Sequence, residues 1–360
     1  GLPEGVPTIA DLLKAQNYFT AIVGKWHLGH SAAGQHPNRR GFEHFYGCIT
    51  GSVDYWTHRG RRGGLDWQRN GESVLEQGYA TDLLALEAKR LIQKHDFARP
   101  MFLYVPFTAP HQPLQAPKGQ YPEYEKINDP ARHTYCVMVT EMDRAIGEII
   151  RSLKERGQYQ NTLIVFLSDN GGAKDQGANN STYRGGKGSV FEGGIKVPAL
   201  LHWPARLPAG GCSSEFTSLL DLAPTIEAAA LPSKSEIEWD GRNLLPLLSD
   251  ATPPSQVEWS TAFVALNSDR VQMALFQSEW KYVRRLDNKK VNKEWLFHLS
   301  EDKEEKNNLA SSEPERVDRM RAELLKWLEL DPLGPRLNEV PISKEDEPKG
   351  WTPPADWASL

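Results

Sequence analysis

Apolar residues along this chain fall into short continuous runs that alternate with stretches of helical spacing. Short apolar runs bounded by turn residues predict buried strands, and apolar residues three and four positions apart predict amphipathic helices. The predicted strands are Phe19–Val23, Met101–Phe107, Thr162–Leu167 and Val197–Trp203. The predicted helices are Thr8–Gln16, Ala80–Gln93, Arg132–Arg156 and Leu219–Ala230. This alternation is typical of an α/β fold, a mostly parallel sheet with helices on both faces.

The pattern changes after residue 249. A stretch rich in Pro and Ser, Ser249–Ser255, predicts a linker, and strands at hairpin spacing follow it. These strands and the helix after them are Thr261–Leu266, Val271–Phe276, Trp280–Arg284 and Glu315–Leu330. We therefore expect a catalytic α/β domain over residues 1–250, a smaller α+β subdomain with an antiparallel sheet over 256–335, and a surface tail over 336–360.

Composition excludes several classes of protein. The formal net charge of -5 argues against nucleic acid as a partner, because phosphate backbones require an excess of Lys and Arg. No apolar run approaches the roughly 18 residues of a transmembrane helix. The three cysteines, Cys48, Cys136 and Cys212, are widely spaced and odd in number. They predict neither a disulfide framework nor a zinc site.

Polar motifs follow three of the predicted strands directly. Lys25 and His27 come after the first strand, His111 after the second, and Asp169 and Asn170 after the third. In open parallel sheets, ligands bind at the carboxyl ends of the strands. The sequence therefore predicts a site at one edge of the sheet.

The residue types in these motifs suit an oxyanion bound beside a hard metal ion. Asp169 and Asn170 offer the oxygen ligands that calcium or magnesium takes. Lys25 and Lys187 offer point charges for sulfate or phosphate oxygens, and the two histidines can move protons near neutral pH. Each signal also has an ordinary reading, since a strand-end lysine is usually solvated and Asp-Asn-Gly-Gly is usually a turn.

The motifs together resemble those of the type I sulfatases, in the order in which that family carries them. The stretches that carry the resemblance are Gly24–Gly29, Ala109–Pro113, Ser168–Gly172 and Arg184–Gly194, with Pro37–Phe42 and Gly51–Trp56 similar to arylsulfatase B-like members. The resemblance covers nearly the whole chain. It implies the alkaline-phosphatase-like α/β fold and hydrolysis of a sulfate ester, either an aryl sulfate or a sulfated sugar.

The resemblance also implies roles for individual residues. Asp169 and Asn170 would bind calcium, one ion per site. Lys25, His111 and Lys187 would contact the substrate. Lys25 and His27 would also hold the nucleophile, and His111 would be the general acid at the leaving oxygen. The implied reaction is attack on sulfur by a formylglycine hydrate with release of the alcohol, followed by collapse of the sulfated hydrate to the aldehyde and free sulfate.

The family's nucleophile motif is missing from these residues. It is Cys/Ser-x-Pro/Ala-x-Arg, and none of the three cysteines stands in it; the paired aspartates that complete the calcium site are also missing. We expect both upstream of Gly1, and we expect this chain alone to be inactive. The resemblance further implies a formylglycine-generating or sulfatase-maturing enzyme as a partner, and export to the periplasm, the lysosome or the cell exterior.

Two alternative functions stay open at this point. One is a phosphomonoester or phosphonate hydrolase of the same superfamily, although a two-metal phosphatase needs further His and Asp ligands. The other is a non-catalytic protein that binds sulfated glycans. The upstream nucleophile motif would distinguish that protein from an enzyme.

Overall fold

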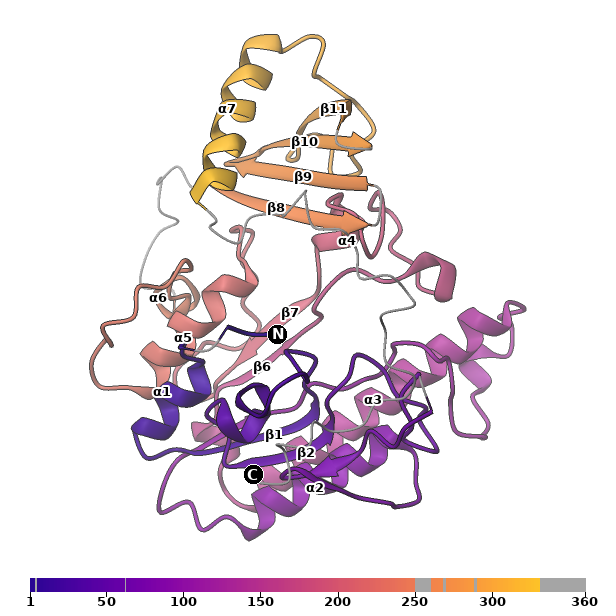
Figure 1. The fold of residues 1–360 in the computed structure, drawn as a ribbon, viewed down its shortest axis with the longest axis vertical. Helices are drawn as coiled ribbons and strands as arrows, with labels where there is room; N and C mark the ends of the chain where they lie inside the picture. The colour runs from indigo at the N-terminus through magenta and orange to yellow at the C-terminus, as the bar shows by residue number, and fades with distance from the viewer. Residues whose placement is uncertain (4, 62, 250–259, 268–269, 288–289, 331–360) are drawn as a thin grey trace. The chain divides into compact units, whose positions relative to one another are not determined.

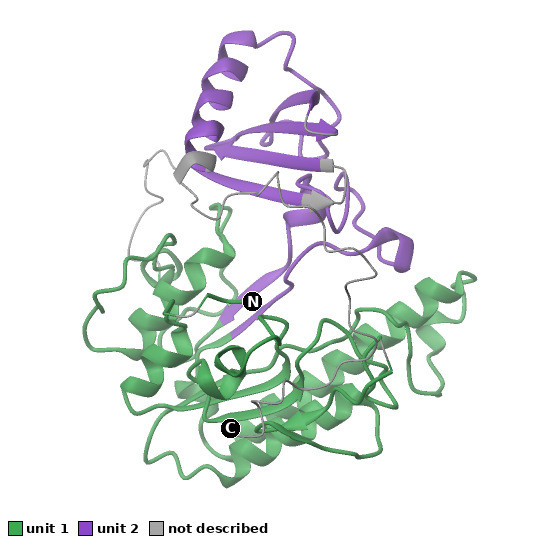
Figure 2. Ribbon diagram, viewed as in Figure 1, with its two compact units in different colours: residues 1–164, 202–254, 348–360 green, residues 165–201, 255–347 purple. Residues whose placement is uncertain are grey.

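The structure is a computed structural model that describes residues 1–3, 5–61, 63–249, 260–267, 270–287 and 290–330. It divides into two compact units (Figure 2). Unit 1 contains the described residues up to 164 and from 202 to 249, and unit 2 contains those from 165 to 201 and from 260 to 330. The expected linker after Ser249 and the expected tail over 336–360 lie outside the described residues. The domain boundaries expected from the sequence stay a prediction.

A five-stranded sheet in the order β4-β3-β2-β1-β5 forms the centre of unit 1. The central strand β1 (Phe19–Lys25) is parallel to β2 (His44–Cys48) on one side and to β5 (Met101–Tyr104) on the other. The short strands β3 (Gln68–Arg69) and β4 (Glu72–Ser73) add an antiparallel edge. The predicted α/β fold is confirmed, although the sequence did not predict β2, β3 or β4.

The central strand β1 contributes to two hydrophobic cores, because successive side chains of a strand point to opposite faces. Ala21 and Val23 pack in a core that also holds residues of α2 (Ala80–Lys94) and α3 (Pro130–Glu155). Ile22, between them, packs in a second core with residues such as Ala10 of α1 and Phe45 of β2. Burial on both faces explains why this strand is a continuous apolar run in the sequence.

Local sequence fixes where two of these helices begin. Thr8 caps α1 (Ile9–Ala15) by accepting a hydrogen bond from the Asp11 N–H, and the Asp11 carboxylate accepts one from the Thr8 N–H. Asp129 caps α3 by accepting a hydrogen bond from the Ala131 N–H at 2.9 Å, with Pro130 as the first helical residue. These caps satisfy backbone N–H groups that have no partner inside the helix.

Unit 2 contains the β6-β7 strand pair and a four-stranded antiparallel sheet in the order β11-β10-β9-β8 (Figure 1). One face of this sheet packs on α7 (Pro314–Leu330) through Val317, Met320 and Leu324. The predicted antiparallel sheet and its helix are confirmed. The strands of unit 2 are β6 (Ile164–Leu167), β7 (Ala199–His202), β8 (Ser260–Asn267), β9 (Arg270–Gln277), β10 (Trp280–Asp287) and β11 (Lys290–His298), of which the terminal residues 164 and 202 fall in unit 1.

The remaining helices are short. They are α4 (Glu192–Ile195), α5 (Leu222–Ala230), α6 (Leu245–Leu248), and the 3₁₀ turns η1 (Ala33–Gln35), η2 (Pro37–Arg39), η3 (Pro122–Tyr124), η4 (Tyr159–Asn161), η5 (Lys174–Gln176) and η6 (Leu219–Asp221). In the part of the chain that the structure describes, none of the helices has the length and apolar character needed to span a bilayer.

Candidate functional site

The six residues predicted to form the site lie in two groups, one in each unit. Unit 1 carries Lys25, His27 and His111, and unit 2 carries Asp169, Asn170 and Lys187. Within each unit, backbone hydrogen bonds and close packing determine where these side chains stand.

Lys25 is the last residue of β1. Its N–H donates to the Pro106 carbonyl at 2.9 Å, and it is paired in register with Cys48 of β2. Cys48 is fully buried, and burial raises the pKa of its thiol well above the usual value. The neighbour of Lys25 on β2 is therefore a neutral thiol at physiological pH and not a nucleophile.

His27 follows two residues later in a left-handed backbone conformation, with φ of 55°. Its N–H donates to the Ile49 carbonyl at 2.9 Å. The imidazole lies against the backbone of Gly51, where a Cβ would stand 2.6 Å from Nε2. Because no side chain fits in that space, Gly51 is required for the observed position of the His27 ring.

Asp66 holds the turn on which His27 rests. This buried carboxylate accepts hydrogen bonds from the Ile49 N–H at 2.9 Å and the Thr50 N–H at 2.8 Å. Burial raises the pKa of Asp66, and the bonds from Thr50 and Ile49 partly offset that effect. The sequence analysis missed Asp66, because a single aspartate outside any motif carries no recognisable pattern.

His111 lies in the loop after β5, and three hydrogen bonds fix it. Its N–H donates to the Thr108 carbonyl at 2.9 Å, and the Tyr55 hydroxyl donates to the His111 carbonyl at 2.9 Å. On the ring, Nδ1 lies 2.8 Å from the Gln112 carbonyl oxygen. A carbonyl only accepts, so Nδ1 carries the hydrogen and Nε2 is the nitrogen at which the ring can exchange a second proton.

These three residues of unit 1 come after the carboxyl ends of two strands that are neighbours in the sheet. Lys25 and His27 follow from β1, His111 follows from β5, and the two strands are parallel. The strands therefore deliver these three residues to the same edge of the sheet. The third motif, Asp169 and Asn170, was expected at this edge too, but it follows β6, which pairs with β7 in a separate two-stranded sheet. The roles assigned to them remain predictions.

In unit 2, Asp169 and Asn170 form a turn directly after β6. The Ser168 hydroxyl donates to the Asn170 carbonyl at 2.9 Å, and the Asn170 amide nitrogen donates to the Gly171 carbonyl at 3.0 Å. Because the amide nitrogen is used in this way, the side-chain oxygen of Asn170 is left as the ligand-type atom. The neighbouring Asp169 side chain is exposed.

This turn fits part of a calcium site. A carboxylate and an amide oxygen suit a hard cation, which takes six to eight oxygen ligands. Among the residues that the structure describes, no group of three or more His, Cys, Asp or Glu side chains could hold a metal ion. The turn therefore offers two oxygen donors, fewer than such a cation takes.

The turn is joined to the loop that carries Lys187. The Lys187 N–H donates to the Gly172 carbonyl at 3.1 Å. Asn180 braces the same residue on both sides, accepting from the Gly172 N–H at 3.0 Å and donating to its carbonyl at 2.8 Å. At Gly171, a Cβ would stand 2.0 Å from the Gly193 carbonyl oxygen, so only glycine lets the two segments meet.

Lys187 is exposed and stands at a cavity of about 370 Å³ within unit 2. The cavity carries two lysines and one aspartate, which gives it a net positive charge suited to an anion. Its lining residues are Lys174, Asp175, Gly185, Gly186, Lys187, Gly188, Ser189 and Gln272.

A buried ion cluster anchors the far end of the Lys187 loop. The ammonium of Lys281 on β10 lies 2.9 Å from Glu192 Oε1 and 2.7 Å from Glu305 Oε1, with Lys281 and Glu305 fully buried. The Glu192 N–H also donates to Glu305 Oε2 at 2.7 Å. Burial raises the pKa of Glu305, and Lys281 partly offsets this. The sequence analysis did not predict this anchor, because its members are far apart in the chain.

Comparison with known proteins identifies the family. The family model described as Sulfatase matches residues 1–230. Arylsulfatase J of Mus musculus is 28% identical over 368 residues, covering 89% of this chain and 61% of that protein. N-acetylgalactosamine-6-sulfatase of Homo sapiens is 34% identical over 264 residues, covering 69% of this chain and 49% of that protein. The chain thus spans about half to three fifths of the length of these curated relatives.

Solved structures agree with this result. The crystal structure of Ps i-CgsB in complex with k-i-k-neocarrahexaose is 35% identical, with a TM-score of 0.82, covering 91% of this chain and 75% of that chain. PsFucS1 sulfatase from Pseudoalteromonas sp., 23% identical with a TM-score of 0.70, shares the fold. The family model covers well over half of the chain. The chain therefore belongs to the sulfatase family.

Proposed function

We propose that the full-length protein to which this chain belongs hydrolyses sulfate esters, with sulfated sugars as its main substrates. The observation that carries this proposal is the hydrogen bond from the Lys187 N–H to the Gly172 carbonyl. It keeps an anion-binding lysine beside a turn with two oxygen donors for a hard cation, the combination that a sulfate group needs. The relatives support a sugar substrate: one is named N-acetylgalactosamine-6-sulfatase, and the Ps i-CgsB structure is a complex with a neocarrahexaose.

The turn after β6 would hold calcium through the Asp169 carboxylate and the Asn170 amide oxygen. When bound, such an ion neutralises negative charge on the sulfate oxygens. The other ligands, and the formylglycine that the family resemblance implies as the source of the attacking oxygen, would come from residues outside those described here. Activation by a maturing enzyme and export are parts of the same proposal.

The two lysines would hold the sulfate group. An ammonium is a compact point charge whose three N–H donors can turn toward any sulfate oxygen. Lys187 would contact the sulfate from its exposed position at the cavity in unit 2. Lys25, fixed at the end of β1, would contact the sulfate and, together with His27, orient the attacking group.

His111 would protonate the leaving alcohol. Its Nδ1 hydrogen is directed at the Gln112 carbonyl, so the proton transferred to the alcohol comes from Nε2. A sugar alkoxide is a strong base and a poor leaving group, so protonation while the sulfur–oxygen bond breaks lowers the barrier. The hydrogen bond from Tyr55 to the His111 backbone keeps the ring in place during this step.

A paired-ester assay tests this proposal. The full-length protein, produced together with a maturing enzyme, would be given 4-nitrophenyl sulfate, 4-nitrophenyl phosphate and a sulfated oligosaccharide, with free sulfate and phosphate measured. We expect sulfate release, reduced at least about 100-fold by Lys187→Ala and kept by the control Lys234→Ala, an exposed lysine of unit 1. Preferred phosphate release would indicate a phosphatase, and binding of the oligosaccharide without release would indicate a glycan-binding protein.

A further inference from the structure

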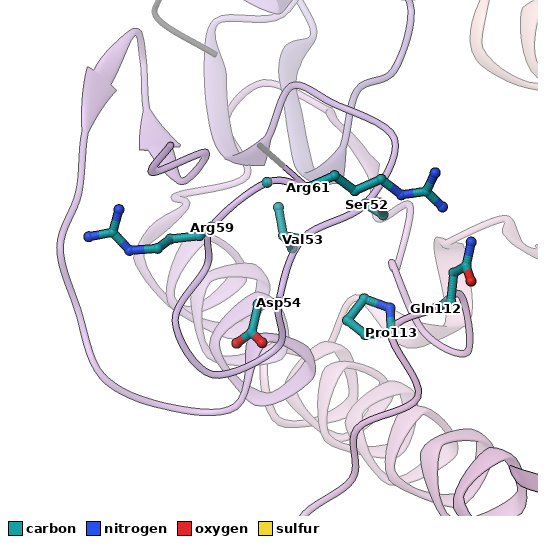
Figure 3. A pocket seen from close by; sticks show the side chains of 8 residues that line it. Ser52, Val53, Asp54, Arg59, Arg61, Gln112 and Pro113 are labelled. Carbon is teal, nitrogen blue, oxygen red and sulfur yellow. The ribbon is translucent and has the colours of Figure 1, made fainter. Parts of the chain in front are cut away.

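A second cavity, of about 360 Å³, lies within unit 1 (Figure 3). Two segments form it: the stretch between β2 and β3, and the start of the loop after His111. Its lining residues are Ser52, Val53, Asp54, Arg59, Gly60, Arg61, Gln112 and Pro113. Nothing in the proposed reaction at sulfur uses these side chains.

The cavity adjoins the loop of the proposed general acid. Gln112 and Pro113 follow His111 directly, and the Gln112 carbonyl accepts the hydrogen of the His111 ring. From the other segment, the hydroxyl of Tyr55, next to the lining residue Asp54, donates to the His111 carbonyl at 2.9 Å. The cavity therefore lies next to the loop that carries His111.

Asp54 belongs to the framework of this cavity. Its carboxylate accepts hydrogen bonds from Gln115 Nε2 at 2.6 Å, from the Thr57 N–H at 2.7 Å and from the Trp56 N–H at 3.0 Å. Burial by itself would raise the pKa of Asp54, but these bonds lower it to about 2. The Asp54 carboxylate is therefore charged at neutral pH, and it is already hydrogen-bonded to the surrounding backbone and to Gln115.

The two arginines of the cavity differ. The guanidinium of Arg59 donates to the Gly63 carbonyl at 2.7 Å and points away from Gln112 and Pro113 in Figure 3. The exposed Arg61 extends on the side of Gln112, and we find no ion pair for it among the residues that the structure describes. The cavity that Arg61 and Gln112 both line therefore carries one positive charge without an ion pair among the described residues, and one amide side chain.

We propose that Arg61 and Gln112 form a subsite for a second anionic group, a sulfate or a carboxylate, on the sugar that leaves or on its neighbour in the chain. A guanidinium binds the oxygens of either group in a bidentate fork, and the Gln112 amide can bind a sugar hydroxyl or an anionic oxygen. This inference rests on the proposed function, because it places the alcohol part of the substrate beside His111. The substrate class would be a polyanionic glycan.

Substrates with one and with two anionic groups test the subsite. Sulfate release by the matured full-length protein would be measured on 4-nitrophenyl sulfate, a monosulfated oligosaccharide, its disulfated analogue and its uronate-containing analogue. For Arg61→Ala we expect a KM at least about tenfold higher on the substrate with the matching second anion, the size of a charged hydrogen bond. Activity on 4-nitrophenyl sulfate should not change. Arg61→Lys should recover part of the loss.

The control is Arg151→Ala, which removes the same charge from an exposed position on α3 and should leave all four substrates unaffected. The proposal is overturned if Arg61→Ala changes no KM, or if it lowers activity on every substrate equally. If the unsubstituted protein releases no sulfate, the proposed function fails, and calorimetric binding of the same oligosaccharides decides the subsite. Arg61→Ala must then weaken binding of the doubly anionic ligand and not of the monosulfated one.

Discussion

At the scale of single residues, hydrogen-bond partners determine what the proposed catalytic groups can do. His111 is the clearest case, because the Gln112 carbonyl fixes its tautomer. We predict that His111→Ala lowers the kcat for a sugar sulfate by about 10²- to 10⁴-fold, the usual contribution of a general acid. The loss on 4-nitrophenyl sulfate should be much smaller, because nitrophenolate leaves without a proton. Equal losses on both substrates in steady-state kinetics would argue against the general-acid role.

His36 makes the stability of unit 1 depend on pH. Burial lowers its pKa from 6.5 to about 4; Gln68 opposes this shift and Arg39 adds to it. Between pH 6.5 and 4, His36 therefore binds a proton in the unfolded chain but stays neutral in the folded state. The contribution of neutral His36 to the free energy of unfolding is present above pH 6.5 and is lost as the pH falls toward 4. We predict a loss of about 2 kcal/mol in the free energy of unfolding between pH 7 and pH 5 from this residue.

Urea unfolding at several pH values checks this prediction, with His36→Asn as the comparison. The Asn38 N–H donates to His36 Nδ1 at 3.3 Å. An asparagine side chain at position 36 offers an oxygen acceptor for this N–H but does not titrate. The variant should lose less stability on acidification. An unchanged pH dependence would show that His36 is not the cause.

The sequence predicted the site residues that stand in motifs, but not the residues whose hydrogen bonds fix the backbone around those motifs. Lys25, His111 and Asp169 were predicted because each follows an apolar run directly. Asp66 and Asn180 act through hydrogen bonds to backbone groups elsewhere in the chain, at Thr50 and Gly172. These hydrogen-bond partners come together only in the tertiary structure, so the local sequence does not predict them.

At the scale of elements, a buried ion cluster connects strand β10 to the Lys187 loop. Lys281→Met would leave two buried carboxylates, Glu192 and Glu305, without their common counter-ion. Breaking a buried pair in this way costs about 3–5 kcal/mol. We predict a large fall in the free energy of unfolding, together with faster proteolysis of the loop.

Lys196→Ala is the matched control for this change. Its half-exposed ammonium lies 3.8 Å from the same Glu192, so removal should cost below about 1 kcal/mol. Denaturant unfolding and limited proteolysis measure both variants. If Lys281→Met were no more destabilising than Lys196→Ala, the cluster would not be an anchor.

Among the elements, strongly periodic segments were predicted well and short ones were not. The helix expected over Arg132–Arg156 is α3, Pro130–Glu155, with its long amphipathic pattern. The strand β2, His44–Cys48, is wholly buried but only five residues long, and it contains a glycine. Its strand character comes from pairing with β1, a long-range contact that periodicity does not reveal.

At the scale of the whole molecule, the proposed mechanism requires a metal ion held partly by the turn after β6. We predict that Asp169→Ala in the full-length protein removes calcium, because it deletes one of the two donors that this turn provides. Calcium content by mass spectrometry and the rise in melting temperature on adding calcium measure this without reference to turnover. Asp143→Ala, at an exposed position on α3, should keep both. Unchanged calcium content in Asp169→Ala would contradict the assignment.

In the proposed mechanism, the sulfate ester breaks between sulfur and the bridging oxygen, and His111 protonates the alcohol. Hydrolysis of a sulfated oligosaccharide by the matured full-length protein in ¹⁸O-labelled water tests which bond breaks, with both products analysed by mass spectrometry. Cleavage at sulfur predicts ¹⁸O in the released sulfate and none in the sugar hydroxyl. Label in the sugar hydroxyl would mean attack at carbon and would rule out this mechanism, as would the absence of any released sulfate.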